Sequence, residues 1–192
     1  INEAENIKIF RDFHANDQNV VIPDVIPTLS GKRVLTLVFE EGDHIEELQS
    51  SAYTQEIINH LGFHLFEVMA QQLFAFQTIH GDPHPGNFAF RKDGTLVIYD
   101  FGCVKKLKPE IVSAYKQAIN SSIREDYQQL DNAMLTLGAR VSSKPSPGEE
   151  YYAVWRDIFF EPFLSQGAYD FSNADLHLRV AKQTPLFFKQ SK

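Results

Sequence analysis

The chain has 192 residues, of which 43% are hydrophobic and 16 are phenylalanine, which is enough apolar material for a well-packed domain. Its net charge of −7 argues against nucleic acid as the main partner, because phosphate backbones require a basic face, and against docking to anionic lipid through charge alone. The single cysteine, Cys103, excludes a disulfide framework and a cysteine-based zinc site.

No segment of the chain approaches the roughly 20 apolar residues that span a bilayer, and no targeting signal is visible. Because the chain begins with Ile1 rather than Met, we expect a piece of a longer protein.

The first part of the chain predicts a helix followed by two strands. Apolar residues at helical spacing predict a helix over 2–14, and runs of β-formers predict strands over 20–22 and 34–39, with Gly42 after the second strand.

Two helices are predicted next, a short one over 45–50 and a long one over 54–79 with Thr54 as its N-cap. One face of the long helix carries His60, His64 and Glu67, which could be read as a metal site. Nothing else in the sequence converges on these three residues. We therefore interpret them as surface or core-edge residues.

The dipeptide Asp93-Gly94 separates two short runs of β-formers, 87–91 and 96–100. Asp-Gly between such runs predicts a β-hairpin with a two-residue type I′ turn. In that register Asn87 lies directly opposite Asp100, with the two Cβ atoms about 5 Å apart. The hairpin would thus place a carboxamide beside a carboxylate, as two ligands for one hard cation.

Asp82 lies five residues before Asn87, across a loop that Pro83, Pro85 and Gly86 prevent from forming a helix. An Asp, an Asn five residues later and a hairpin that ends in Asp-Phe-Gly are typical of the catalytic and metal loops of kinases. Asp-Phe-Gly alone is a weak indication, whereas the combination is strong.

The same loop offers another interpretation, a metal triplet formed by His80, Asp82 and His84. Alternation would place the three side chains on one side of an extended strand, but Pro83 and Pro85 oppose a regular strand. We prefer His80 as a structural residue that braces the loop through hydrogen bonds.

The second half of the chain reads as helical, with one clear loop. An amphipathic helix carries an aromatic stripe, and no Ala-Pro-Glu motif follows the Asp-Phe-Gly, which argues against a protein substrate. Helices are predicted over 109–122, 126–137, 149–164 and 174–182, with the loop over 142–148.

The octapeptide His-Gly-Asp-Pro-His-Pro-Gly-Asn over 80–87, followed by Asp-Phe-Gly over 100–102, resembles the UbiB family of atypical kinases, also called AarF or ADCK proteins. Members occur in bacteria, mitochondria and plastids and are linked to ubiquinone and other isoprenoid-lipid metabolism. The resemblance implies an α+β, protein-kinase-like fold, with a truncated small lobe and hinge over 1–42 and the helical large lobe over 43–192. It also implies an enzyme, a kinase or ATPase that uses ATP and Mg²⁺, although this fragment alone is expected to be inactive.

By this resemblance Asn87 and Asp100 bind Mg²⁺, and Asp82 orients the acceptor hydroxyl or water. The segment Glu3-Ala4-Glu5-Asn6 matches the family's Glu-Ala-x-Asn, in which the Glu pairs with a phosphate-binding Lys. Glu3 inherits that role, with a solvated Glu in a first helical turn as the alternative. The partner Lys and the nucleotide loop are not found in the chain.

The family's hinge presents backbone groups to adenine, and this implies nucleotide contacts at Phe39 and Glu40. The stripe of Tyr152, Trp155 and Phe159 packs a core by default; an apolar groove for an isoprenoid tail is the alternative.

Two other functions remain open. Aminoglycoside and choline phosphotransferases share a similar His-Gly-Asp loop, although Pro83 and the intact Asp-Phe-Gly favour the UbiB family. A pseudokinase scaffold that binds nucleotide is the non-enzymatic alternative.

The expected partners are a nucleotide, a lipid or quinone precursor, the missing N-terminal kinase segment and, through missing segments, a membrane surface. The family implies the bacterial cytoplasm or inner-membrane surface, the mitochondrion or the plastid.

Overall fold

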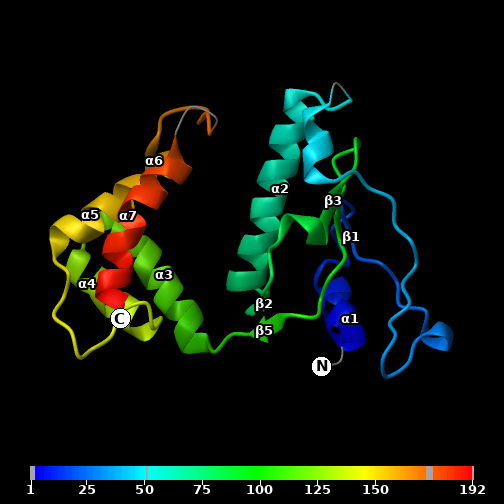
Figure 1. Cartoon of the computed structure of the whole chain (residues 1–192), viewed down its shortest axis with the longest axis horizontal. Helices are drawn as coiled ribbons and strands as arrows, with labels where there is room; N and C mark the ends of the chain where they lie inside the picture. Colours follow the sequence, from blue (N-terminus) through cyan, green and yellow to red (C-terminus); the bar gives the residue numbers. More distant parts are fainter. Residues whose placement is uncertain (1–2, 51, 172–174, 192) are drawn as a thin grey trace. The chain divides into compact units, whose positions relative to one another are not determined.

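The computed structural model describes residues 3–50, 52–171 and 175–191, with side chains up to residue 185. The chain divides into two compact units, residues 1–107 and 108–192 (Figure 1). Among the described residues, no helix is both long and apolar enough to cross a bilayer. The first unit contains α1 (Glu3–Phe13), β1 (Val20–Val21), the 3-10 helices η1 (Pro27–Leu29) and η2 (Ile45–Gln49), α2 (Gln55–Phe74), β2 (Thr78–His80), the 3-10 helix η3 (Pro85–Asn87), β3 (Phe88–Phe90), β4 (Leu96–Ile98) and β5 (Val104–Lys106).

Two small sheets organise the first unit. In the three-stranded sheet the order is β1-β4-β3, with β1 parallel to β4 and with β3 and β4 forming an antiparallel hairpin. The two-stranded sheet pairs β2 with β5 in antiparallel fashion, so that His80 lies opposite Val104. The segment over 81–103 therefore leaves and returns on neighbouring strands, which brings its two ends together.

The core of the first unit lies among α1, α2 and the hairpin. Leu61 and Val68 on α2 are fully buried, and α2 packs against β2 and β4 (Figure 1). From α1, the ring of Phe10 lies 5.0 Å from the ring of Phe101 between centroids, and both side chains are fully buried. Since burying one phenylalanine contributes roughly 1.5–3 kcal/mol, this contact anchors α1 on the Asp-Phe-Gly segment.

The predicted strand over 34–39 is wrong, because the structure has only isolated bridges there. Val25 is bridged to Leu37, and hydrogen bonds tie 24–26 to 36–38 in a narrow ribbon. Pro23 and Pro27 lack the N–H groups that would extend this pairing into a ladder.

The long helix predicted over 54–79 begins as expected and ends early. The Thr54 hydroxyl accepts the N–H of Ile57, which confirms the N-cap. The helix ends at Phe74, and Gln77 adopts a positive φ of 52°. The chain then turns into β2, where the side chains of Thr78 and His80 are buried.

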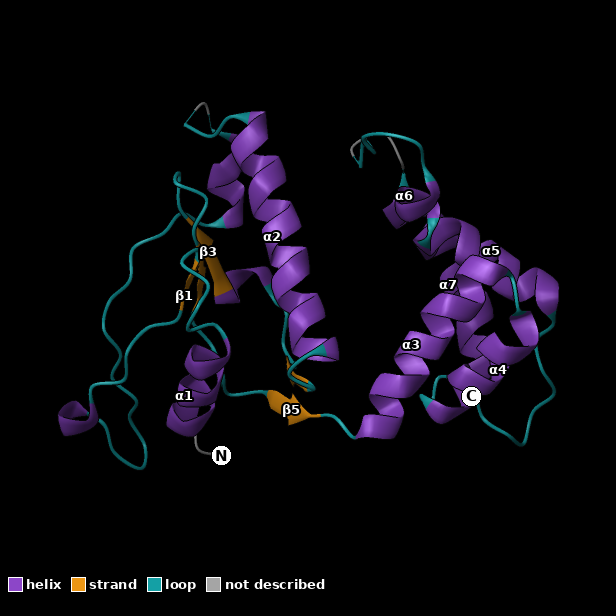
Figure 2. Ribbon diagram, turned by 180° about the vertical axis from the view of Figure 1, so that it is seen from behind, coloured by secondary structure: helices purple, strands orange, loops and turns teal. Residues whose placement is uncertain are grey.

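The second unit is helical (Figure 2) and matches most predicted boundaries. Asp126 caps α4 by accepting the N–H of Gln129, and Gly138 follows the helix with φ of 73°. The helix predicted over 149–164 is broken at Phe160, two residues before Pro162, which lacks the N–H that a continuous helix would use there. The helix predicted over 174–182 extends further than expected, and Ala174 lies outside the described residues. The helices are α3 (Pro109–Arg124), α4 (Tyr127–Thr136), α5 (Glu149–Phe159), α6 (Glu161–Leu164) and α7 (Leu176–Ser191).

Candidate functional site

The loop that precedes β3 is held at its start by the buried side chain of Gln72, in α2. Gln72 Oε1 accepts the backbone N–H of His80 at 3.0 Å. His80 Nδ1 in turn accepts the N–H of Asp82 at 3.3 Å. The imidazole also packs against the rings of Phe88 and Phe101. The prediction that His80 braces the loop through hydrogen bonds is confirmed.

Asn87 holds the other end of this loop. Its Nδ2 donates to the backbone carbonyl of Asp82 at 2.9 Å, across a turn in which His84 Nδ1 accepts the N–H of Gly86. In the described part of the chain, neither the Asp82 carboxylate nor Asn87 Oδ1 makes a hydrogen bond. The loop is therefore shaped by side chains that bond its backbone groups, and the Asp82 carboxylate and the Asn87 amide oxygen remain available to ligands.

Asp100 lies in a turn that α1 supports. Its Oδ1 accepts the N–H of Gly102 at 2.7 Å, and Asn6 Nδ2 donates to the carbonyl of Phe101 at 2.8 Å. A Cβ placed on Gly102 would lie 3.2 Å from Asp100 Oδ1 and 3.9 Å from Glu3 Oε2. The two carboxylates thus approach one point, and such a pair of like charges favours a cation nearby.

The hairpin register differs from the prediction by one residue. Phe88 pairs with Ile98, and the N–H of Tyr99 donates to the carbonyl of Asn87 at 3.0 Å. Asn87 is therefore opposite Tyr99 rather than Asp100, so the predicted direct pairing is wrong. Asp100 comes one residue after the position opposite Asn87, and the two residues still lie at the same end of the hairpin.

The reason for the shift is the turn, whose loop has three residues, 92–94. The N–H of Gly94 donates to the carbonyl of Arg91 at 3.0 Å, and the N–H of Arg91 donates to the carbonyl of Thr95 at 2.9 Å. Only Gly94 has a positive φ, at 90°, whereas a type I′ turn needs two such residues. Asp93 Oδ1 instead accepts the N–H of Thr95, and this hydrogen bonding lowers the pKa of Asp93.

Asn87 and Asp100 fit a magnesium ion by the chemistry of their donors. In the part of the chain that the structure describes, no three His, Cys, Asp or Glu side chains form a metal cluster. Mg²⁺, however, is commonly bound through one or two carboxylates, with waters and substrate phosphates as its other ligands. Asp100 has one carboxylate oxygen outside the Gly102 hydrogen bond, and Asn87 has a free amide oxygen. These residues suit a cation that arrives with a nucleotide.

The histidine groups considered in the sequence do not form metal centres among the described residues. His64 Nδ1 lies 3.9 Å from Glu67 Oε2, and His64 Nε2 lies 3.6 Å from Asp17 Oδ2. The ring of His60 stacks at 6.1 Å from that of His64. These residues belong to the edge of the α2 packing, as we interpreted them.

The predicted hinge residues lie in an extended segment that the hairpin holds in place. Arg91 donates from Nη2 to Glu40 Oε2 and from Nε to the carbonyl of Glu41, both at 2.7 Å. The Tyr99 hydroxyl donates to the carbonyl of Glu40 at 2.8 Å. The side chain of Phe39 is 83% exposed. Glu40 is thus fixed on two sides, whereas the Phe39 side chain is exposed.

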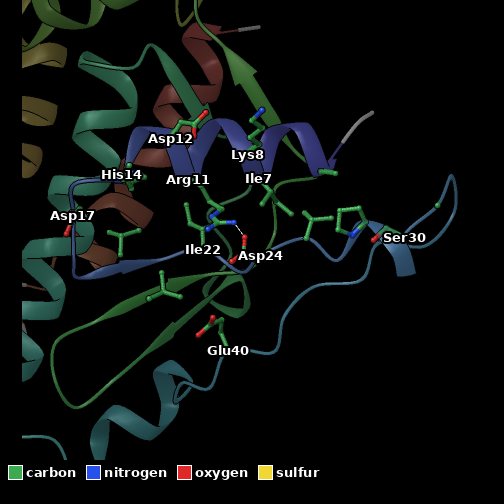
Figure 3. Close-up of a pocket in the computed structure, with 17 residues that line it drawn as sticks. Ile7, Lys8, Arg11, Asp12, His14, Asp17, Ile22, Asp24, Ser30 and Glu40 are labelled. Carbon is green, nitrogen blue, oxygen red and sulfur yellow. Dashed lines mark ion pairs between the residues drawn. The ribbon is translucent and has the colours of Figure 1, made fainter.

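An open cavity of about 1110 Å³ lies between α1 and the segment that leads to the hinge. Figure 3 shows α1 on one side of this cavity and Glu40 on the other, with an ion pair between Arg11 and Asp24. Neither Glu3 nor Asp100 lines it, so the cavity reaches the predicted hinge but not the metal loop.

A second cavity, of about 420 Å³, lies within the helical unit. Trp155 and Phe159 line it together with Tyr115 and Val180. Tyr152, on the same stripe, is buried in a small core with Leu130. Tyr152 also lines this cavity, so the stripe both packs a core and borders the cavity, and an isoprenoid ligand there stays a prediction.

Four residues that shape the site were not predicted as functional: Asn6, Gln72, Arg91 and Tyr99. Asn6 was visible in the sequence as the last residue of the Glu-Ala-x-Asn match. The other three act through partners far away in the chain, and no local pattern indicates them.

Comparisons with known proteins indicate the family and the fold of the chain. A family model described as the ABC1 atypical kinase-like domain matches residues 1–134. The chain is 29% identical over 178 residues to an uncharacterized aarF domain-containing protein kinase from chloroplasts of Arabidopsis thaliana, covering 92% of this chain and 24% of that protein. It is 26% identical over 192 residues to the mitochondrial atypical kinase coq-8 of Caenorhabditis elegans, covering 97% of this chain and 25% of that protein. The chain thus spans about a quarter of the length of these relatives.

A solved complex of Rv3197 with erythromycin, from Mycobacterium tuberculosis, shares the fold with a TM-score of 0.67 and 23% identity, over 85% of this chain and 41% of that one. The resemblance to UbiB and AarF proteins is therefore confirmed, as is the α+β, kinase-like fold. The chain belongs to the family of ABC1 atypical kinase-like domains.

Proposed function

We propose that this chain carries the catalytic and metal loops of an atypical kinase or ATPase of the UbiB type that uses Mg²⁺ and ATP. One observation carries the proposal: the β3–β4 hairpin places Asn87 and Asp100 at the same end, and Asn87 also holds the backbone of Asp82. The Asp100 carboxylate and the Asn87 carboxamide suit a metal-bound phosphate, and the exposed Asp82 carboxylate suits the acceptor of that phosphate.

In this proposal Asp100 and Asn87 hold Mg²⁺ through the oxygens that make no hydrogen bond within the described residues. The ion would supply neutralisation of the charge that develops on the transferred phosphoryl group. Asp82 accepts a hydrogen bond from the acceptor hydroxyl or water and orients it, because its carboxylate is exposed beside the loop. The rate gain comes from positioning and electrostatics, and no covalent intermediate on the protein is required.

The remaining nucleotide contacts follow from the same arrangement. Glu3 lies beside Gly102, where it would orient a phosphate-binding lysine. Phe39 and Glu40 would present backbone groups to adenine. We also propose that the small lobe and hinge end at about residue 42 and that the large lobe follows.

We propose ubiquinone or another isoprenoid lipid pathway as the setting, since a relative is the mitochondrial atypical kinase coq-8. The partners would then be a nucleotide and a lipid or quinone precursor, at a membrane surface reached through segments outside this chain. Two similar relatives are named as chloroplastic and mitochondrial proteins, which supports an organelle or a bacterial counterpart.

The test is a thermal-shift titration with ATP, with and without Mg²⁺, on the native protein that carries this chain. Asp100→Asn is the test variant, and Glu5→Gln is its control, since Glu5 is exposed on α1, does not line the cavity that reaches Glu40 and makes no ion pair among the described residues. We expect Mg²⁺-dependent stabilisation by ATP in wild type and in Glu5→Gln, and its loss in Asp100→Asn.

An equal Mg²⁺-dependent shift in Asp100→Asn would refute the metal assignment. ATP binding without turnover of any acceptor or of water would indicate a pseudokinase scaffold. Turnover of soluble alcohols or amines would instead favour the aminoglycoside or choline phosphotransferase class.

A further inference from the structure

Tyr99 connects the two ends of the proposed nucleotide site. It directly precedes Asp100, and its backbone N–H donates to the carbonyl of Asn87 at 3.0 Å. Its hydroxyl donates to the carbonyl of Glu40 at 2.8 Å. One residue therefore touches both proposed metal ligands and the hinge.

Arg91 completes the attachment from the other end of the hairpin. Its guanidinium is about two-thirds buried and bonds the carboxylate of Glu40 and the carbonyl of Glu41, both at 2.7 Å. A guanidinium is planar and holds its two donors in a fixed geometry, so it fixes the orientation of what it binds. Arg91 also begins the turn of the hairpin, which makes it part of the rigid ladder rather than of a mobile loop.

These contacts leave the backbone N–H of Glu40 open. Its carbonyl is taken by Tyr99 and its carboxylate by Arg91, whereas its backbone N–H makes no hydrogen bond among the described residues. Glu40 also lines the open cavity of Figure 3. A peptide N–H held in a fixed orientation suits a ring-nitrogen acceptor, such as the one on the edge of adenine.

We propose that Tyr99 and Arg91 are positioning residues that lock the hinge onto the metal-bearing hairpin. They hold the Glu40 N–H at a set distance from Asn87 and Asp100, so that the base and the phosphates of one nucleotide are accommodated together. The proposal rests on the proposed function, because it assumes that a nucleotide occupies the site. Neither residue touches the reacting phosphate; both act through Glu40.

Tyr53, which precedes α2 and bonds the same hairpin, provides a matched control. Its hydroxyl donates to Asp43 Oδ2 at 2.8 Å and to the carbonyl of Phe90 at 3.0 Å, and its side chain is buried. None of these hydrogen bonds goes to Glu40, Asn87 or Asp100. Tyr53→Phe should therefore lower the stability of the fold at least as much as Tyr99→Phe, while leaving the nucleotide untouched.

The experiment measures the Kd for ATP by calorimetry, with Mg²⁺ and in its absence, on the native protein that carries this chain. Wild type is compared with Tyr99→Phe, Arg91→Gln, Tyr53→Phe and Asp100→Asn. We expect Tyr99→Phe and Arg91→Gln to raise the Kd about three- to tenfold, the range for one lost hydrogen bond. The rise should be equal with and without Mg²⁺, because these variants act at the base and not at the metal.

Asp100→Asn should leave the Kd measured without Mg²⁺ unchanged and remove only the decrease in Kd that Mg²⁺ causes. An unchanged Kd in both Tyr99→Phe and Arg91→Gln would overturn the positioning role while leaving the proposed function standing. An equal rise in Tyr53→Phe would also overturn it, since the effect would then be general loosening of the hairpin. Failure of wild type to bind ATP would overturn both proposals.

Discussion

The side-chain amide of Asn6 donates a hydrogen bond to the backbone carbonyl of Phe101, at 2.8 Å. This bond joins α1 to the Asp-Phe-Gly segment across 95 positions of sequence. Beside it the ring of Phe101 packs on that of Phe10, also from α1. The position of α1 is therefore set by the peptide next to Asp100, and a change in either alters the other.

Asn6→Ala is expected to lower the free energy of unfolding by roughly 1–3 kcal/mol, because the half-buried Phe101 carbonyl would lose its partner. Denaturant unfolding measures this loss. The same substitution at Asn120, an exposed position in α3 with no hydrogen bond of its side chain among the described residues, controls for helix propensity. Equal stability of the two variants would show that the bond contributes nothing.

Gly81→Ala is expected to destabilise the fold by roughly 1–3 kcal/mol, since overpacking next to backbone forces the chain to move. The Gly81 N–H donates to the Cys103 carbonyl, and a Cβ on Gly81 would lie 2.9 Å from that oxygen and from Cys103 Sγ. Gly62→Ala is the control, because Gly62 lies inside α2 with nothing within 4 Å of its Cβ position. There alanine should stabilise the protein, by about 1 kcal/mol. Thermal unfolding that moves both variants in the same direction would contradict this account.

The hairpin shows one feature that could be predicted from the sequence and one that could not. The dipeptide Asp93-Gly94 correctly predicted a hairpin, because Gly94 adopts the positive φ that a tight turn needs. The register was wrong by one residue, because Asp93 uses its side chain to accept the N–H of Thr95 and does not take a positive φ itself. A sequence shows that Asp can do either, and the choice depends on the strands around it.

The other predictions were correct where local residues decide the structure and incomplete where partners far away in the chain decide it. The loop around His80 was predicted well because Pro83 and Pro85 restrict it locally. Tyr99 and Arg91 act through the hinge, which lies 51 positions from Arg91 and 59 from Tyr99 at Glu40. No periodicity indicates such a contact. The strand expected over 34–39 failed for a related reason, because its partner segment contains prolines that sequence alone does not place opposite it.

Gly102→Ala is expected to remove much of the Mg²⁺-dependent part of ATP binding while leaving the folded protein almost as stable. The added Cβ would lie 3.2 Å from Asp100 Oδ1, which is tight enough to displace that carboxylate. Gly102 does not have a positive φ, so alanine adds no backbone strain. Calorimetry with and without Mg²⁺ separates the two effects. An ATP affinity that stays equally Mg²⁺-dependent would argue that Asp100 does not bind the metal.

His14 is expected to make the stability of the protein depend on pH. Its ring is buried and lies edge-on to Phe76, and neither ring nitrogen has a hydrogen-bond partner among the described residues. Burial lowers its pKa from 6.5; nearby Asp17 opposes this and His64 adds to it. The unfolded chain therefore binds a proton more readily than the folded one, so the contribution of neutral His14 is fully present above pH 6.5 and is lost as the pH falls toward the lowered pKa. Denaturant unfolding between about pH 5 and 8 should show a steeper loss in wild type than in His14→Leu, with the exposed His177→Leu behaving like wild type. Identical pH profiles in all three proteins would mean that the pKa of His14 is the same in the folded and the unfolded chain, which would contradict this account.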